Sequence, residues 1–189
     1  ITRDNYMTTG RVYQTVIERE RNLGYNGKCV EVVPRVPEEV IRRIDHVAEQ
    51  SQADFVLIEI GGTVGEYENI LFLEALRMMR QRDADSVRSV IVSYLPVPPS
   101  IGEMKTKPTQ HAVREANRAG ISPDFLIARS EDEMDEPRRE KLARFCAIPI
   151  KHIIGAPNVE SIYKIPQSFE DQNFGDSLLE SFGIDPKPA

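Results

Sequence analysis

Short apolar runs alternate along the chain with stretches in which apolar residues recur every three or four positions. The runs predict strands at residues 29–33, 55–58, 89–95, 124–128 and 150–154. The periodic stretches predict helices at residues 10–21, 66–80, 108–119 and 137–146, one opened by Pro37, and short ones beginning within 158–162 and over 174–182. This alternation is typical of an α/β fold, and with no evident linker it favours a single domain.

The run at residues 55–58 is apolar throughout, as expected of a central parallel strand covered on both faces. Glu59 follows it, and Gly61 and Gly62 come next but one. A carboxylate at the carboxyl end of such a strand can hold Mg²⁺ bound to nucleotide phosphates, and glycines let backbone N–H groups approach phosphate. A strand whose last side chain simply meets solvent explains Glu59 equally well.

Two lysines and two threonines are concentrated at residues 105–110, where a proline-rich loop enters a predicted helix. A helix N-terminus attracts anions through its free N–H groups and its dipole, and Lys105 and Lys107 add point charges. The segment therefore suits a triphosphate. Composition alone favours the simpler interpretation, a solvated loop with ordinary surface lysines.

Two further groups are weaker candidates for ligand binding. Glu66 and Glu68 flank Tyr67 and could accept hydrogen bonds from a ribose or a base, but carboxylates are also favourable at the start of any helix. Lys141 and Phe145 lie one helical turn apart and share a face. A surface lysine above a core phenylalanine is the commoner reason for that spacing.

Composition narrows the choice of partner and compartment. The 189 residues carry 24 Lys+Arg against 30 Asp+Glu, a net charge of -6, which argues against a general binder of nucleic acids or anionic membranes. No apolar run approaches the ~20 residues that span a bilayer. Cys29 and Cys146 belong to no metal-ligand motif and are expected to be buried thiols in a reducing cytosol. No GxxxxGK(S/T) phosphate loop occurs.

Taken together, these segments resemble one known family. The strings EIGGTVG at residues 59–65 and KTKPTQ at residues 105–110 are highly specific. Further matches follow in chain order at residues 7–13, 32–34, 72–75, 102–103, 122–124 and 159–166. On these residues nearly the whole chain resembles the CTP synthase family, in the later part of its synthetase (amidoligase) domain.

The resemblance implies an enzyme that makes CTP from UTP, ATP and glutamine-derived ammonia. In this family ATP phosphorylates the uracil O4 and ammonia displaces that phosphate, while CTP inhibits by sharing the triphosphate site of UTP. The resemblance also implies Mg²⁺ as cofactor, a glutaminase domain in the same enzyme, a homotetramer with nucleotide sites at its interfaces, and a cytoplasmic location. Neither a nucleic-acid nor a membrane partner is expected.

The family's binding residues carry over position by position. Glu59 resembles one of two Mg²⁺ ligands at the ATP site, and Glu74 matches a position tied to CTP feedback. The remaining matches are Lys105, Thr106, Lys107, Pro108, Thr109, Gln110 and Lys141 for UTP and CTP, Glu66, Tyr67 and Glu68 for CTP as inhibitor, and Pro157, Asn158 and Val159 along the adenine of ATP.

Four positions near the inhibitor pocket depart from the family pattern. Arg35, Glu66, Tyr67 and Leu71 stand where His, Asp, Ile and Pro are usual. These departures bear on the strength of CTP feedback rather than on the identity of the substrate.

The family's P-loop and second Mg²⁺ aspartate precede the point that matches Ile1, and the glutaminase domain follows the point that matches Ala189. The expected fold is a three-layer, P-loop-NTPase-like α/β fold with a mainly parallel sheet, lacking its N-terminal P-loop portion. Residues 1–189 would be a processed product or a piece, forming a partial synthetase domain that does not turn over alone. A non-catalytic CTP/UTP sensor or assembly module is the alternative. The UTP segment disfavours a third idea, a dethiobiotin-synthetase-like ligase.

Overall fold

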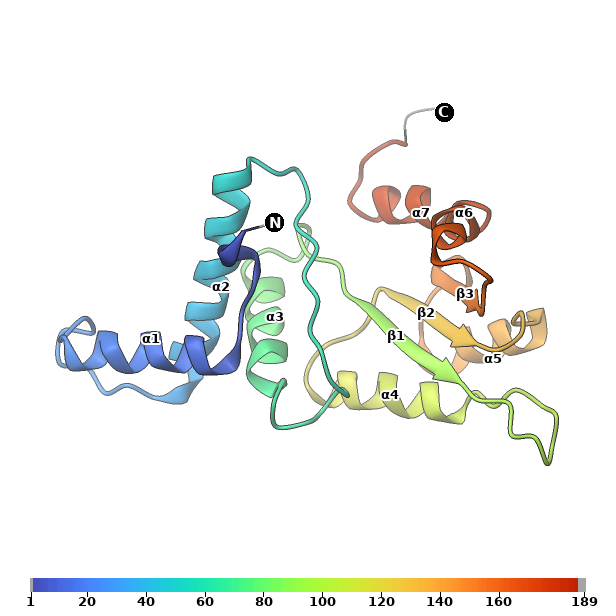
Figure 1. Cartoon of the computed structure of the whole chain (residues 1–189), viewed down its shortest axis with the longest axis horizontal. Coiled ribbons are helices and arrows are strands. Elements are labelled where there is room, and N and C mark those ends of the chain that lie inside the picture. Colours follow the sequence, from blue (N-terminus) through green and yellow to red (C-terminus); the bar gives the residue numbers. More distant parts are fainter. Residues whose placement is uncertain (1, 187–189) are drawn as a thin grey trace. The chain divides into compact units, whose positions relative to one another are not determined.

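The computed structural model describes residues 2–186, and the chain divides into two compact units, Ile1–Ala84 and Asp85–Ala189. Figure 1 shows the helices of the first unit in blue to green and the sheet of the second in green to red. The α/β class predicted from the sequence is confirmed, because a parallel sheet with helices packed on it forms the second unit. The assignment of all 189 residues to one synthetase domain stays a prediction.

The first unit is helical. It contains a short 3₁₀ helix, Arg3–Asn5, followed by α1 (Thr9–Arg21), α2 (Val32–Ser51) and α3 (Ile70–Arg82), with α2 packed against both neighbours. The Thr8 side chain accepts a hydrogen bond from the Arg11 N–H and so caps the start of α1. The buried side chains at the centre of this unit are Val12, Val16, Val36, Val40 and Ala75.

Two strands predicted in the first unit are wrong. The run at residues 29–33 leads into α2. This helix begins at Val32, about one turn before Pro37, and has a kink at Val33. The run at residues 55–58 forms neither helix nor strand, and Leu57 is 92% exposed. A buried parallel strand needs strand neighbours for its backbone and layers over both faces. All three strands among residues 2–186 belong to the other unit.

The second unit is built on three parallel strands in the order β1 (Val90–Leu95), β2 (Phe125–Ser130) and β3 (Ile153–Pro157). Its longer helices are α4 (Lys107–Arg118) and α5 (Glu136–Cys146), and α6 (Ile165–Glu170) and α7 (Phe174–Ser181) follow β3. Short 3₁₀ helices, Ile150–His152 and Ile162–Lys164, precede β3 and α6.

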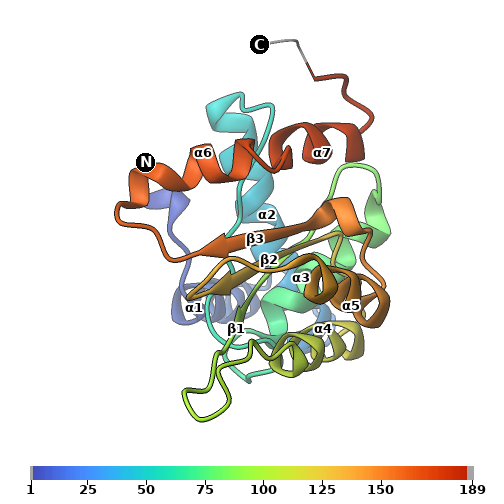
Figure 2. The ribbon, with the colours of Figure 1, turned by 90° about the vertical axis from the view of Figure 1, so that its right-hand side faces the viewer.

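Helices lie on both faces of this sheet (Figure 2). On one face the Ser93 hydroxyl of β1 meets Thr109 of α4, at 2.9 Å between the two oxygens. On the other face the Phe125 ring of β2 stacks on His152 and meets Phe174 of α7 edge to face. Val92 and Tyr94 of β1 stay exposed on that second face, so its cover is confined to the β2 and β3 side.

The sequence-based boundaries in this unit hold with one shift. The strands at 89–95 and 124–128 and the helices at 108–119, 137–146 and 174–182 are confirmed to within two residues. The strand predicted at 150–154 begins at Ile153, because a 3₁₀ turn takes up Ile150–His152. The helix predicted to begin within 158–162 starts at Ile162, the last residue of that range. None of the helices between residues 2 and 186 combines the length and the apolar character needed to span a bilayer.

One side chain takes the place of a neighbouring strand at the outer edge of β3. Gln172 accepts a hydrogen bond from the Gly155 N–H through Oε1 and donates one from Nε2 to the Gly155 carbonyl, both at 2.8 Å. Its Nε2 also donates to the Ser168 carbonyl at 2.9 Å. Since an open strand edge exposes unpaired backbone groups, this amide both satisfies and blocks part of the edge.

Replacing Gln172 by alanine should therefore destabilise the protein by about 1–3 kcal/mol, because four side-chain hydrogen bonds are lost and two backbone groups of Gly155 lose their partner. The free energy of unfolding in urea is the measurement. Gln167→Ala is the matched control, since Gln167 is exposed and bonds only to Asp171 by its amide, and should change stability by less than about 0.5 kcal/mol. Equal effects of the two substitutions would contradict the role given to Gln172.

Candidate functional site

The candidate site lies where the three parallel strands end. The segments that follow β1, β2 and β3 leave the same edge of the sheet, because parallel strands all point the same way. Residues 96–106 connect β1 to α4, residues 131–135 connect β2 to α5, and residues 158–161 follow β3. We call this region the carboxyl edge.

Two cations contact one carboxylate at the carboxyl edge. Lys105 donates a hydrogen bond from Nζ to Oε2 of Glu103 at 2.7 Å, and Arg138 of α5 lies 3.3 Å from Oε1 of the same side chain. The hydrogen bond from Lys105, together with the positive charges of Lys105, Arg138 and Lys141, lowers the pKa of Glu103 below its usual value. Lys105 and Arg138, which come from different elements, therefore converge on one carboxylate.

Half of the predicted nucleotide segment faces inward. Thr106, Thr109 and Gln110 are buried, while Lys107 and Pro108 are exposed. The Thr109 hydroxyl donates to the Tyr94 carbonyl at 3.3 Å besides meeting Ser93.

The Gln110 amide donates to the Thr106 hydroxyl at 3.1 Å, which keeps these two buried polar groups paired with each other. The helix predicted from Pro108 begins at Lys107. Because the buried side chains fix the start of α4, the segment is an anchored helix N-terminus rather than the solvated loop that composition favoured.

The residues matched to the adenine stretch lie at the end of β3. The Asn158 N–H donates to the Ser130 carbonyl at 3.0 Å, and Arg129 of β2 donates to the Asn158 side-chain oxygen at 3.2 Å. Pro157 and Val159 are half-buried on either side of Asn158. This stretch thus shares the carboxyl edge with residues 105–110, with β2 between them, and its contact with ATP stays a prediction.

The residues matched to the CTP inhibitor lie in the first unit, in the turn before α3. The helix predicted from Glu66 begins at Ile70, so these residues precede it. Glu66 accepts a hydrogen bond from the Thr63 N–H at 3.2 Å, Tyr67 is 93% exposed, and Glu68 is exposed. Their contact with CTP stays a prediction.

Asn69, which the sequence reasoning missed, holds this turn together. It is buried, and its side-chain amide donates to the carbonyls of Gly61 at 3.3 Å and Thr63 at 2.7 Å. Asparagine directly before a helix is a common N-cap residue, and that signal could have placed the helix start correctly. Glu74 of α3 forms an ion pair with Arg77 at 2.7 Å, and the hydrogen bond from Arg77 lowers the pKa of Glu74.

The predicted magnesium ligand has little support around it. Glu59 is exposed in the segment that forms no strand, so the structure does not place it at the end of a sheet strand. Residues 2–186 contain no group of three or more His, Cys, Asp and Glu side chains arranged to hold a metal ion. Mg²⁺ is usually held by one or two carboxylates together with phosphate oxygens. The role of Glu59 as a ligand of Mg²⁺ therefore stays a prediction.

Two sequence-based expectations about single side chains need revision. Phe145 is not a core residue beneath Lys141: it is 61% exposed, and Lys141 is exposed too. Cys146 is buried as predicted, and burial raises the pKa of its thiol to about 11, but Cys29 is exposed. Cys29 lies in the loop before α2. The strand predicted at residues 29–33, which was expected to bury this side chain, does not form.

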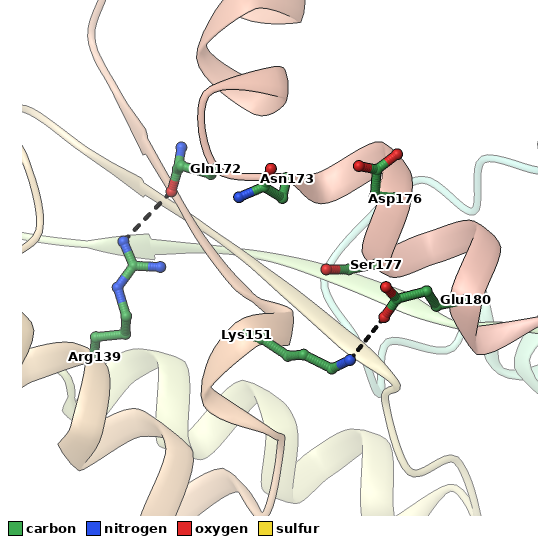
Figure 3. A pocket seen from close by; sticks show the side chains of 7 residues that line it. All are labelled: Arg139, Lys151, Gln172, Asn173, Asp176, Ser177 and Glu180. Carbon is green, nitrogen blue, oxygen red and sulfur yellow. Dashed lines mark hydrogen bonds and ion pairs between the residues drawn. The ribbon is translucent and has the colours of Figure 1, made fainter. Parts of the chain in front are cut away.

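A pocket of about 450 Å³ lies elsewhere, between α5, the start of β3 and α7 (Figure 3). Lys151 in its wall forms an ion pair with Glu180 at 2.9 Å. Arg139 donates to the Ile153 carbonyl and to Gln172. Arg139 and Lys151 thus already have partners among the residues around this pocket. Lys151 precedes β3, so the pocket lies at the end of the strand opposite the carboxyl edge.

A parallel α/β unit with lysines at the carboxyl ends of its strands is suited to binding phosphate-bearing ligands. Comparison with known proteins shows the family of this chain. The family model for the CTP synthase N-terminus matches residues 1–184, and the chain belongs to that family. The resemblance read from the sequence is confirmed.

Individual relatives agree with the family assignment. The chain is 41% identical over 180 residues to a CTP synthase of Methanosphaera stadtmanae, covering 95% of this chain and 34% of the relative. It is 42% identical over 185 residues to that of Halobacterium salinarum, covering 97% and 33%. With the CTP synthase of Dehalococcoides mccartyi the identity is 41% over 190 residues, covering 100% and 35%. The chain thus spans about a third of the length of these relatives.

The buried Thr109 hydroxyl should support the carboxyl edge by coupling α4 to β1. Thr109→Val keeps the side-chain shape but removes the hydroxyl, and should cost about 1–2 kcal/mol of unfolding free energy, since Ser93 and the Tyr94 carbonyl each lose a partner. Ser93→Ala combined with Thr109→Val tests the pair directly. In urea unfolding the double variant should lose less stability than the sum of the single variants, by about 0.5–1.5 kcal/mol, whereas strict additivity would show that the two hydroxyls do not interact.

Proposed function

We propose that this chain is part of the synthetase domain of a CTP synthase and that its carboxyl edge holds the phosphates of UTP, and of CTP as inhibitor. The observation that carries the proposal is the convergence of Lys105, a position matched to the UTP site, and Arg138 on a single carboxylate at the carboxyl edge. Cationic side chains that converge on one point are suited to a polyphosphate, because each phosphate oxygen accepts charge-assisted hydrogen bonds.

The reaction proposed for the whole enzyme is ATP-dependent amination of UTP. ATP phosphorylates the uracil O4, and ammonia derived from glutamine replaces that phosphate. Within this chain, Lys105, Lys107 and Lys141 would bind the phosphates, and the buried Thr106, Thr109 and Gln110 would fix the start of α4. Residues 157–159 would lie along the adenine, and residues 66–68 would contact CTP. When bound, Mg²⁺ would neutralise phosphate charge, with Glu59 as one of its ligands.

The remaining parts of the proposal concern the setting of this chain. The three parallel strands are compatible with a three-layer, P-loop-NTPase-like fold. We propose that the chain works with a glutaminase domain in a homotetramer in the cytoplasm, without nucleic-acid or membrane partners. Because the 189 residues contain no GxxxxGK(S/T) loop, they should bind UTP without converting it.

Nucleotide binding is tested with the double variant Lys105→Ala/Lys107→Ala. Loss of two phosphate contacts should weaken the binding of UTP about 10- to 100-fold in isothermal titration calorimetry, because a hydrogen bond to a charged group contributes about 1.5–3 kcal/mol at most. Lys151→Ala removes a lysine that lies away from the carboxyl edge and should leave UTP affinity unchanged. A wild-type chain that does not bind UTP, or equal loss with Lys151→Ala, would contradict the proposal.

Turnover is tested separately by incubating the chain with UTP, ATP, Mg²⁺ and ammonium and following CTP by chromatography. We expect no CTP above the background without protein. CTP formation would show that these residues suffice for catalysis. UTP and CTP binding without turnover, even after addition of the rest of a CTP synthase, would instead favour the nucleotide sensor.

A further inference from the structure

Glu103 is the residue at the carboxyl edge that the binding proposal does not explain. Its carboxylate contacts Lys105 at 2.7 Å and Arg138 at 3.3 Å, in the place where the cations converge. An anionic ligand that used these cations would meet a negative charge already there. The Glu103 side chain is 56% exposed, so its ion pairs contribute little to stability and water can replace them.

The cations are anchored more firmly than the carboxylate. Arg138 also donates from Nε to the Met104 carbonyl at 3.1 Å and pairs with the Asp135 side chain. The backbone N–H of Lys105 donates to the Pro96 carbonyl at 2.9 Å. Rotation of the Glu103 side chain would therefore expose the cations without moving the backbone that presents them.

We propose that Glu103 is an internal counter-ion of the phosphate site: it occupies the place between Lys105 and Arg138 that the phosphates of a nucleoside triphosphate take, and it turns away when they bind. This inference rests on the proposed function and adds Arg138 to the cations that face the phosphates. It gives Glu103 a defined effect, because the free energy of breaking its ion pairs is subtracted from the affinity for every phosphate ligand.

The test is Glu103→Gln in the whole chain, with UTP and inorganic tripolyphosphate as probes in isothermal titration calorimetry. Removing the charge while keeping the shape should raise the affinity for both probes about three- to tenfold, in line with the small energies of exposed ion pairs. Thermal unfolding should change little. Glu131→Gln is the matched control, because Glu131 follows β2 at the same edge and accepts a hydrogen bond from Tyr94 at 3.1 Å; its affinities should equal those of the wild type.

The outcomes separate this inference from the proposed function. Wild-type binding of UTP with an unchanged or lower affinity in Glu103→Gln overturns the counter-ion alone. Binding of neither probe by either protein overturns both. An equal gain in Glu131→Gln shows a general charge effect and overturns the counter-ion, as does a gain for tripolyphosphate without one for UTP. A gain for both probes that only Glu103→Gln shows supports it.

Discussion

The parallel pairing of β1, β2 and β3 is the constraint on which the candidate site depends. The register sets Leu95 beside Ser130 and Ser130 beside Pro157, so the three strands end together. Everything that follows a strand then starts from one edge, whatever its distance in sequence. Lysines from residues 105–110 and from α5, and the turn at Asn158, are brought to that edge by backbone hydrogen bonds made elsewhere, in the interior of the sheet.

Buried hydroxyl and amide side chains connect the sheet to the segment that carries Lys105 and Lys107. Ser93 and Thr109 couple β1 to α4, and Thr106 and Gln110 pair one turn on. Buried polar groups are costly unless they are bonded, which makes such contacts specific about geometry. Residues 105–110 thus differ in their surroundings: the buried Thr106, Thr109 and Gln110 determine where α4 begins, whereas Lys107 and Pro108 are exposed and Lys105 is half-buried.

Elements that depend on the local pattern of apolar and polar residues could be predicted from the sequence. Strands and buried residues that depend on tertiary neighbours could not. Residues 89–95 and 124–128 became strands because each finds a parallel partner. Residues 55–58 are as apolar as those runs, yet they have no strand neighbour among the described residues, and no periodicity in the run itself could reveal this. Cys29 and Phe145 were misjudged for the same reason, since burial depends on what packs against a residue.

Within the site, the lysines were found from their motif, whereas Glu103 and Arg138 were missed. Glu103 stands two residues before Lys105 in a proline-rich loop, whose sequence gave no reason to expect an ion pair. Arg138 belongs to a helix chosen for its apolar stripe, and its approach to the loop after β1 is a tertiary contact. Charge partners that come from different elements are the part of a site that a single sequence conceals most effectively.

The missed carboxylate also resolves an apparent conflict between composition and site. A chain of net charge -6 is a poor general binder of anions, yet its carboxyl edge gathers cations. Cations held close together repel one another, and Glu103 offsets that repulsion while no ligand is bound. Arg138 is paired with Asp135 as well, so carboxylates balance the positive charges at this point until a ligand takes the place of Glu103. Local arrangement, not net charge, therefore determines what this surface can attract, and the acidic remainder of the chain disfavours longer polyanions that would extend beyond the edge.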